Sequence, residues 1–273
     1  MKSILFYSLC IMFFICVFHA VRANTYEVIN VNNTGAGSFR EAITDANANA
    51  GPDSINFNIA GTGPFSIVLA SALPNISGAI IINGTTQPGF VSGTQATYVK
   101  VGSAYTGTIC SAINVTGITI KGLDISYQSV RSGAGISFNT CSQTLIIDNF
   151  IRNRNSGISI NGGQDHTVQN NDLLATSSDF NNPALSFLNI TPGNIASGLA
   201  VSGNKFGGNG LTALRIQNMN NVLVGDTSVV GANVVLEDNS GLTAMGAAGH
   251  YVLYFINVNN ITVDNVDVSY LSG

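Results

Sequence analysis

The chain has 273 residues, of which 45% are apolar and only 9% are charged, and its formal net charge is −4. A mean hydropathy of +0.30 excludes an intrinsically disordered chain, which needs low hydrophobicity and high charge. The sequence has no cluster of Lys and Arg that could neutralise phosphates, so we do not expect a nucleic-acid-binding protein.

Residues 1–23 have the features of a secretory signal peptide. Lys2 is followed by an apolar run from Ile4 to Phe18, and small residues precede a cleavage position after Ala23. This run of about 15 apolar residues is shorter than the roughly 20 that a membrane-spanning helix needs. Cleavage would leave 8 bases (10 minus 2) against 14 acids, a net charge of −6. We therefore expect a secreted or cell-surface protein with no membrane span after cleavage.

Residues 24–60 are expected to form an N-terminal cap. Ser38 and Glu41 make a capping box for a short helix that ends near Ala48, and an alternating strand begins near Ile55. Stacked coils expose an unpaired sheet edge at each end, and such a helix would cover one of them.

Residues 61–273 contain a degenerate repeat, in which the pattern of residues 111–125 recurs at 254–268 with six of fifteen residues identical. When the copies of the repeat are aligned on one apolar reference position, the positions ten and eight residues before it and five residues after it are also apolar or small in the five best copies. The closest copies are 22 residues apart, from Ile146 to Val168, and a unit this short must stack on its neighbours to bury its apolar side. Alternating strands with Asn and Gly at the turns favour a parallel β-helix over a helical solenoid. The reference position holds Ile120, Ile146, Val168, Val224 and Val263.

The fold class that follows is all-β, a single-stranded right-handed parallel β-helix, or solenoid, with a short N-terminal capping helix. The chain ends at Gly273 directly after a good copy of the repeat. We therefore expect the β-helix to be truncated at its C-terminal end, with an anchor, a sorting signal or a catalytic module beyond it. As a fragment, the chain is expected to be a monomer.

Several polar or reactive residues are predicted to be structural. Asparagines recur at the turns, where they tolerate left-handed backbone and can hydrogen-bond to an identical neighbour one coil away. Cys110 and Cys141 fall in inward columns, which favours buried free thiols over a disulfide or a metal site. His166 falls in a mostly apolar column, which favours a buried structural histidine over a general base. No two histidines share a metal-ligand spacing, so neither a metal nor a cofactor is expected.

The N-terminal region resembles a known family. The matching stretches are Val31–Ile43 (VNNTGAGSFREAI), 45–47, 51–57, Leu73–Ile76 and Ile80–Phe90 (IIINGTTQPGF). Over about residues 26–90 they are similar to the CSLREA-type N-terminal region of bacterial secreted parallel β-helix proteins, although no Cys precedes Ser38 and Phe39 stands where Leu is usual. The resemblance implies an exported, surface-associated right-handed β-helix, often adhesin-like, and it implies no catalytic residue.

The candidate binding site is an outward row of side chains four residues after the reference position. The row reads Asp124, Phe150, Asp172, Lys205, Ser228 and Asp267, and the candidate binding residues are Asp124, Phe150 and Asp172. Asp124 and Asp172 would lie two coils apart, about 9.6 Å, with the ring of Phe150 between them as a platform for a sugar. The alternative is a solvated column with an ion pair of little consequence between Asp172 and Lys205.

Insertions are expected to leave the coil at one corner and to form a ridge of loops. They cover 126–135, 152–157, 174–190, 207–213 and 230–252, with Tyr127, Arg131, Arg152, Arg154, Phe180, Tyr251 and Tyr254 in or beside them. Loops that stack along one edge are a common place for recognition.

The function favoured by these features is a non-enzymatic, adhesin-like binding or stalk module whose partners are glycans or cell-surface polymers. A polysaccharide lyase or glycoside hydrolase of the pectin-degrading β-helix type is the alternative, because the fold hosts such enzymes. The polygalacturonase motifs are present only as fragments, at 249–251 and 214–217, without an Asp-Asp pair. A purely structural spacer is the third possibility.

Overall fold

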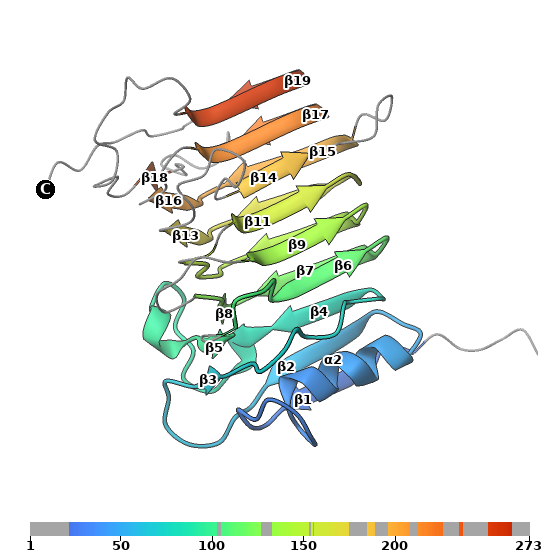
Figure 1. Ribbon diagram of the computed structural model, residues 1–273, viewed down its shortest axis with the longest axis vertical. Coiled ribbons are helices and arrows are strands. Elements are labelled where there is room, and N and C mark those ends of the chain that lie inside the picture. The colour runs from blue at the N-terminus through green and yellow to red at the C-terminus, as the bar shows by residue number, and fades with distance from the viewer. Residues whose placement is uncertain are drawn as a thin grey trace, which may run out of the picture.

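The computed structural model describes residues 22–102, 105–126, 133–152, 154, 156–174, 185–188, 196–207, 212–225, 235–236 and 251–263. The described strands form three sheets, and every strand pair is parallel. Coils of chain are stacked from β1 at one end to β19 at the other (Figure 1). This arrangement confirms the predicted parallel solenoid.

The elements of the stack are short, apart from the last two long strands. The elements are β1 (Thr25–Val28), α2 (Phe39–Ala48), β2 (Asp53–Phe57), β3 (Ser66–Ile67), β4 (Ile80–Asn83), η1 (Gly84–Thr86), η2 (Gln95–Thr97), β5 (Val99–Val101), β6 (Cys110–Ile113), β7 (Thr116–Lys121), β8 (Leu123–Asp124), β9 (Ala134–Asn139), β10 (Ser142–Ile147), β11 (Ser156–Asn161), β12 (His166–Gln169), β13 (Asp172–Leu174), β14 (Leu185–Leu188), β15 (Ala196–Ser202), β16 (Lys205–Gly207), β17 (Thr212–Val224), β18 (Val235–Leu236) and β19 (Tyr251–Val263).

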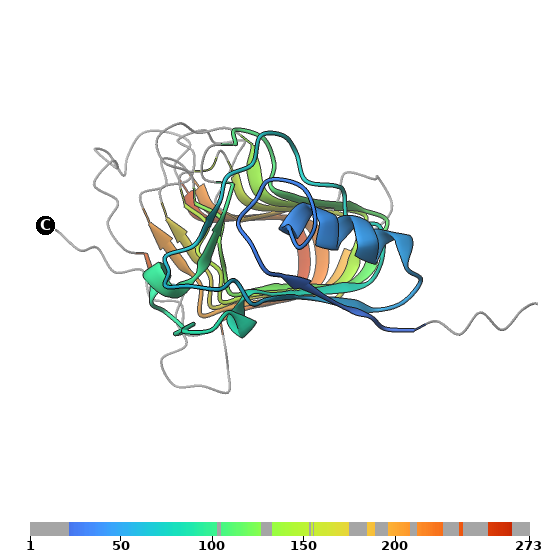
Figure 2. The ribbon, with the colours of Figure 1, turned by 90° about the horizontal axis from the view of Figure 1, so that it is seen from below.

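The predicted capping helix is present as α2. The side chain of Ser38 accepts a hydrogen bond of 3.2 Å from the backbone N–H of Glu41, which is the N-cap half of the predicted capping box. The other half differs, because the backbone N–H of Ser38 donates to the carbonyl oxygen of Gly35 at 3.0 Å and not to Glu41. The apolar face of α2 belongs to the core of the stack, where the ring of Phe39 lies 5.3 Å from that of Phe57 on β2. Seen along the stack, α2 lies across the interior of the first coil (Figure 2).

The predicted register is confirmed at the reference position of the repeat. Ile120 pairs with Ile146, Ile146 with Val168, and Val224 with Val263. Val201 of β15 stands between Val168 and Val224, as expected for the poorer sixth copy. These side chains are fully buried except that of Val263, which lies on β19, the last described strand.

Two strands depart from the predicted pattern. β14 lies inside the expected insertion 174–190, and its Leu185 pairs with Ile158 and with Leu214. The repeat did not reveal β14 because seven residues separate the end of β14 from the start of β15. In other coils the corresponding turn is shorter, such as the turn between Asn139 of β9 and Ser142 of β10. The second case concerns the apolar column five residues after the reference position, where the repeat predicts Val229. The structure has Leu236 there instead, paired with Phe206. Val229 and Val268 themselves lie outside the described residues.

The buried polar groups are structural, as predicted. The side-chain amide of Asn149 donates to Oδ1 of Asn171, and that of Asn171 donates to Oδ1 of Asn204, at 2.9 Å in both cases. Cys110 and Cys141 are buried free thiols, and burial raises the pKa of Cys110 to about 12. No described helix is long and apolar enough to cross a membrane.

Candidate functional site

The outward row forms as predicted, but its exposure was predicted wrongly. Asp124 bridges to Phe150 and Phe150 to Asp172 on successive coils, and Asp172 pairs with Lys205. Asp124, Phe150 and Asp172 are nevertheless only 4%, 7% and 9% exposed. The side chains of these three residues point away from the interior of the coil, but other parts of the chain cover them on the outer side.

Asp124 is covered by residues 84–98, which we call the covering segment. Gln95 ties this segment down, because its Nε2 donates to Oδ2 of Asp124 at 2.9 Å and its Oε1 accepts from Nη1 of Arg152 at 3.1 Å. The backbone N–H of Ser126 donates to the other Asp124 oxygen at 3.0 Å. Asp124 therefore holds the covering segment in place and does not line the pocket described below.

Phe150 is part of an aromatic cluster rather than an open platform for a sugar. The ring of Tyr98 meets it edge-on, with 4.8 Å between centroids, and the ring of Phe90 lies 4.6 Å from that of Tyr98. The guanidinium of Arg152 lies 5.0 Å from the centre of the Phe150 ring. Edge-to-face and tilted aromatic contacts and a cation–π contact of this kind stabilise the covering segment on the coil.

The ion pair of Asp172 is with Arg152, not with Lys205. Nε of Arg152 donates to Oδ1 of Asp172 at 2.8 Å, and Nη2 contacts Oδ2. This two-point geometry fixes both side chains. The charges of Arg152 and Asp172 therefore neutralise each other at the edge of the pocket.

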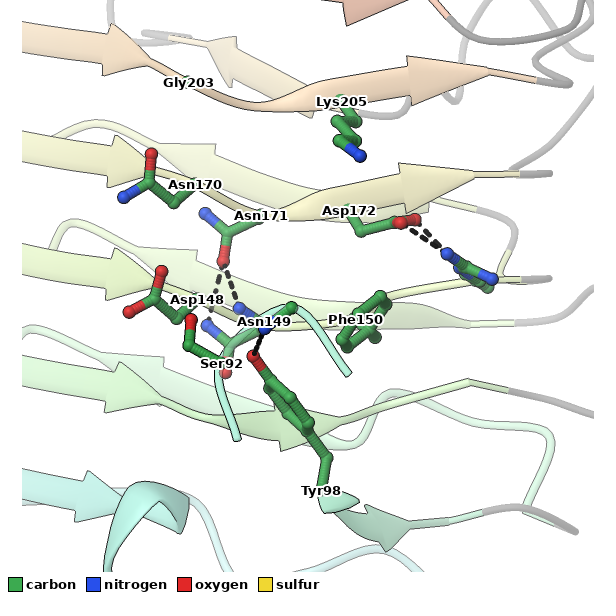
Figure 3. Close-up of a pocket in the computed structure, with 12 residues that line it drawn as sticks. Ser92, Tyr98, Asp148, Asn149, Phe150, Asn170, Asn171, Asp172, Gly203 and Lys205 are labelled. Atoms are coloured by element: carbon green, nitrogen blue, oxygen red, sulfur yellow. Dashed lines mark hydrogen bonds and ion pairs between the residues drawn. The ribbon is translucent and has the colours of Figure 1, made fainter. Parts of the chain in front are cut away.

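A pocket of about 400 Å³ lies beside this cluster (Figure 3). Asp148 and Asn170 lie on one side of the asparagine ladder, and Phe150, Asp172 and Lys205 lie on the other. Ser92, Gly93 and Tyr98 of the covering segment form a wall, which is stiffened where the N–H of Gly93 donates to the Tyr98 hydroxyl at 3.0 Å. The complete lining is Ser92, Gly93, Tyr98, Asp148, Asn149, Phe150, Arg152, Asn170, Asn171, Asp172, Gly203 and Lys205.

Equivalent positions of successive coils build the floor of this pocket. Asp148, Asn170 and Gly203 all have left-handed backbone, with φ of 55°, 54° and 61°. This conformation suits Gly and is tolerated by Asn and Asp, which explains why these residue types stand at this turn. The floor therefore presents a carboxylate and an amide one coil apart, about 4.8 Å.

Asp148 is the pocket residue with a shifted pKa. Burial raises the pKa of its carboxyl, while a hydrogen bond from Asn170 and the charge of Lys121 act in the opposite direction. A partly desolvated carboxylate is a strong acceptor for ligand hydroxyl groups. Sequence reasoning did not select Asp148, because it stands in a turn column that was assigned a purely structural role.

Most of the predicted loop ridge lies outside the described residues, and the described part differs from the prediction. Arg154 was expected as a contact residue but is fully buried, where its guanidinium donates to the carbonyl oxygens of Gly102 and Tyr105, both at 2.8 Å. Tyr127, Arg131, Phe180, His250 and most of the predicted insertions lie outside the described residues. Tyr251 and Tyr254 belong to β19.

His166 is not a catalytic candidate. It is buried, and its Nδ1 lies 2.9 Å from the hydroxyl of Thr144 on the neighbouring coil. Burial lowers its pKa to about 4, so the imidazole is neutral at physiological pH. Within the described part of the chain, no three His, Cys, Asp or Glu side chains are grouped as metal ligands.

The fold and the pocket define the class of this protein as a capped parallel β-solenoid with a polar surface pocket. No family model and no curated protein matches the chain. Among solved structures, ORF18 of Geobacillus virus E2 is similar over 93% of this chain and 52% of its own, with 13% identity and a TM-score of 0.53. This similarity shows a shared fold, and the chain spans about half the length of that protein.

Two weaker similarities are to carbohydrate-active enzymes. An alginate lyase from Paenibacillus sp. str. FPU-7 matches 90% of this chain and 99% of its own, with 13% identity and a TM-score of 0.40. The catalytic domain of a GH87 alpha-1,3-glucanase matches 90% of this chain and 68% of its own, with 12% identity and a TM-score of 0.18. Both TM-scores are below 0.5, so these similarities do not bear on the activity of this chain.

Proposed function

We propose that the chain is an exported, right-handed parallel β-helix of the CSLREA type, acting outside the cell or at its surface. In this proposal it is a non-enzymatic, adhesin-like module that binds carbohydrate in the pocket between the covering segment and the coils. The leader-like residues 1–23 and the N-terminal motifs support export and the family. The parallel stack and the α2 cap agree with that architecture.

The observation that carries the proposed ligand class is the lining of the pocket. It combines the carboxylate of Asp148, the amide of Asn170, the ammonium of Lys205 and the hydroxyl of Ser92 with the edge of an aromatic cluster. Sugars present many hydroxyl groups that both donate and accept hydrogen bonds, and such a lining offers partners for both roles. Most of the lining comes from the stacked coils and the rest from the covering segment, which Gln95 bonds to Asp124 and Arg152, so the pocket is formed before a ligand binds.

The test is a glycan array with the chain from residue 24 onward. Asp148→Asn keeps the shape of the side chain and the left-handed turn but removes the charge. We expect it to weaken binding of the array hits about tenfold, because a charge-assisted hydrogen bond contributes roughly 1.5–3 kcal/mol. Asp165→Asn is the matched control, since Asp165 also has left-handed backbone, with φ of 58°, but lies outside the pocket.

The outcomes separate the candidate functions. Binding that Asp148→Asn weakens and Asp165→Asn leaves unchanged supports the proposed site. Equal effects of the two variants would contradict the site, and a parent chain that binds no glycan would favour the spacer.

A polysaccharide lyase or hydrolase is the second candidate, because Asp148 and Asp172 line the same pocket and burial raises the pKa of Asp148. Glycoside hydrolysis needs two carboxyl groups with different protonation states. This candidate predicts release of reducing ends, or of unsaturated products, from polysaccharides that the parent binds. The release would be lost in Asp148→Asn and kept in Asp165→Asn.

A further inference from the structure

A buried carboxylate lies directly beside the expected cleavage site. Asp53, the first residue of β2, is 1% exposed. Its Oδ1 accepts hydrogen bonds from the backbone N of Asn24 at 2.8 Å and from Nδ2 of Asn49 at 2.7 Å. Asn24 is the residue that follows the predicted cleavage position, and Asn49 is the C-cap residue of α2. Asp53 therefore links the start of β1, the end of the capping helix and the start of β2.

The second oxygen of this carboxylate lacks a partner. Oδ2 of Asp53 is buried and accepts no hydrogen bond from any described residue. The ion pair found in the described part of the chain, between Arg152 and Asp172, lies elsewhere in the stack. A buried carboxylate with neither a counter-charge nor a full set of donors destabilises the folded state.

Cleavage after Ala23 would supply what is missing. It converts the backbone N of Asn24 from a neutral amide with one hydrogen into an ammonium with three hydrogens and a positive charge. This nitrogen is already 2.8 Å from Oδ1, so it can keep that hydrogen bond while a second hydrogen turns to Oδ2. A free α-amino group has a pKa of about 7.7–8.0 and is largely protonated at neutral pH.

We propose that the α-ammonium group created by removal of residues 1–23 forms an ion pair with the buried carboxylate of Asp53 and thereby locks the N-terminal cap. While the leader is attached, the cap lacks this cation and the first coil is less stable. Completion of the fold is in this way coupled to processing. The inference rests on the export part of the proposed function and is independent of what the pocket binds.

The experiment compares three forms of the chain that differ only at the N-terminus. One begins at Asn24 with a free amine, one is the same chain acetylated at that amine, and one begins at Arg22. We expect the free-amine form to melt roughly 3–10 °C above the other two, because it alone has the charge-assisted pair. Hydrogen exchange of residues 25–57 should slow in the same form, which locates the effect in the cap.

Asp53→Asn is the matched variant, because it keeps the acceptor at Oδ1 and removes the charge. The difference between the free-amine and acetylated forms should disappear in this background. Equal melting of the three parent forms, or a difference that persists with Asp53→Asn, would overturn the proposal. If Asp53→Asn does not fold, the comparison of the free and acetylated parent chains decides alone.

N-terminal sequencing of the exported protein tests the cleavage position separately. Asn24 as the first residue supports the proposal, and a different first residue overturns it. Loss of glycan binding in the array would remove the proposed ligand class but would leave the melting and sequencing results as they stand.

Discussion

The asparagine ladder offers the sharpest test of what holds the coils together. The side chain of Asn171 donates to the carbonyl oxygens of Ile146 and Gln169 and to Oδ1 of Asn204, each at 2.9 Å. It accepts from the backbone N and from Nδ2 of Asn149, at 3.0 and 2.9 Å. Five hydrogen bonds of one buried side chain thus join three coils.

Asn171→Asp changes the chemistry of this side chain without changing its shape. It keeps the two accepting contacts, removes the donors and places a carboxylate against buried acceptor oxygens. Each lost buried bond costs about 1 kcal/mol and each uncompensated partner about 1–3 kcal/mol more. We therefore expect the free energy of unfolding to fall by about 3–5 kcal/mol, which belongs to the large class of mutational effects.

The assay is urea unfolding followed by circular dichroism. Asn260→Asp is the control, because Asn260 is an exposed asparagine whose side chain donates to Oδ1 of Asn221 at the surface. It should change stability by less than about 0.5 kcal/mol. The deficit of Asn171→Asp relative to the parent should shrink in acid, where the protonated carboxyl can donate again. A variant within 0.5 kcal/mol of the parent at neutral pH would refute the view that the ladder stabilises the stack.

Three further predictions follow from buried groups. Burial lowers the folded pKa of His166 to about 4, below its unfolded value of about 6.5. The stability that the neutral imidazole contributes to the free energy of unfolding is therefore fully present above about pH 6.5 and is lost as the pH falls toward 4, by at most about 3 kcal/mol. Urea midpoints should fall with pH over this range, and they should fall less in His166→Leu. Arg154→Met should cost about 3–5 kcal/mol because it leaves buried carbonyl oxygens without donors, whereas Arg152→Met, which removes a half-buried arginine from the carboxylate of Asp172, should cost less in the same assay, about 1–3 kcal/mol. Phe150→Ala should lower stability by about 2–4 kcal/mol, contrary to the sequence-based expectation for an exposed ring, and an unchanged melting temperature would contradict the packing of Phe150 against Tyr98.

The register of the coils could be predicted because it depends on the alternation of apolar and polar residues within each strand. Inward and outward residues alternate along each strand, and a slip of one residue would turn every apolar side chain outward. The alternation within each strand therefore determines which residues pair with Ile120 and with Ile160 on the neighbouring coils. No knowledge of the loops is needed for this. The turn asparagines are equally local, since left-handed backbone selects their residue type.

The cover over the outward row could not be predicted in this way. Gln95 reaches Asp124 and Arg152 across 29 and 57 residues of chain, and neither distance is a multiple of a repeat. Contacts of this kind depend on where an aperiodic segment happens to fold back. The sequence could place Phe150 on the outside of the coil but could not show that Tyr98 would cover it.

The pocket lies where this aperiodic segment ends, and that position follows from the architecture. A perfect repeat gives each coil the same surface, so a single-copy site needs a feature that occurs once. The covering segment supplies it: Asp124 lies beneath Gln95, whereas Asp148 and Asn170, on the next two coils, line the pocket above the segment. The Arg152–Asp172 pair then fixes one edge of the opening, and Gln95 joins that edge to the cover. The stack provides evenly spaced side chains, and among the described residues the non-repeating covering segment determines which of the side chains around Asp124 and Asp148 a ligand can reach.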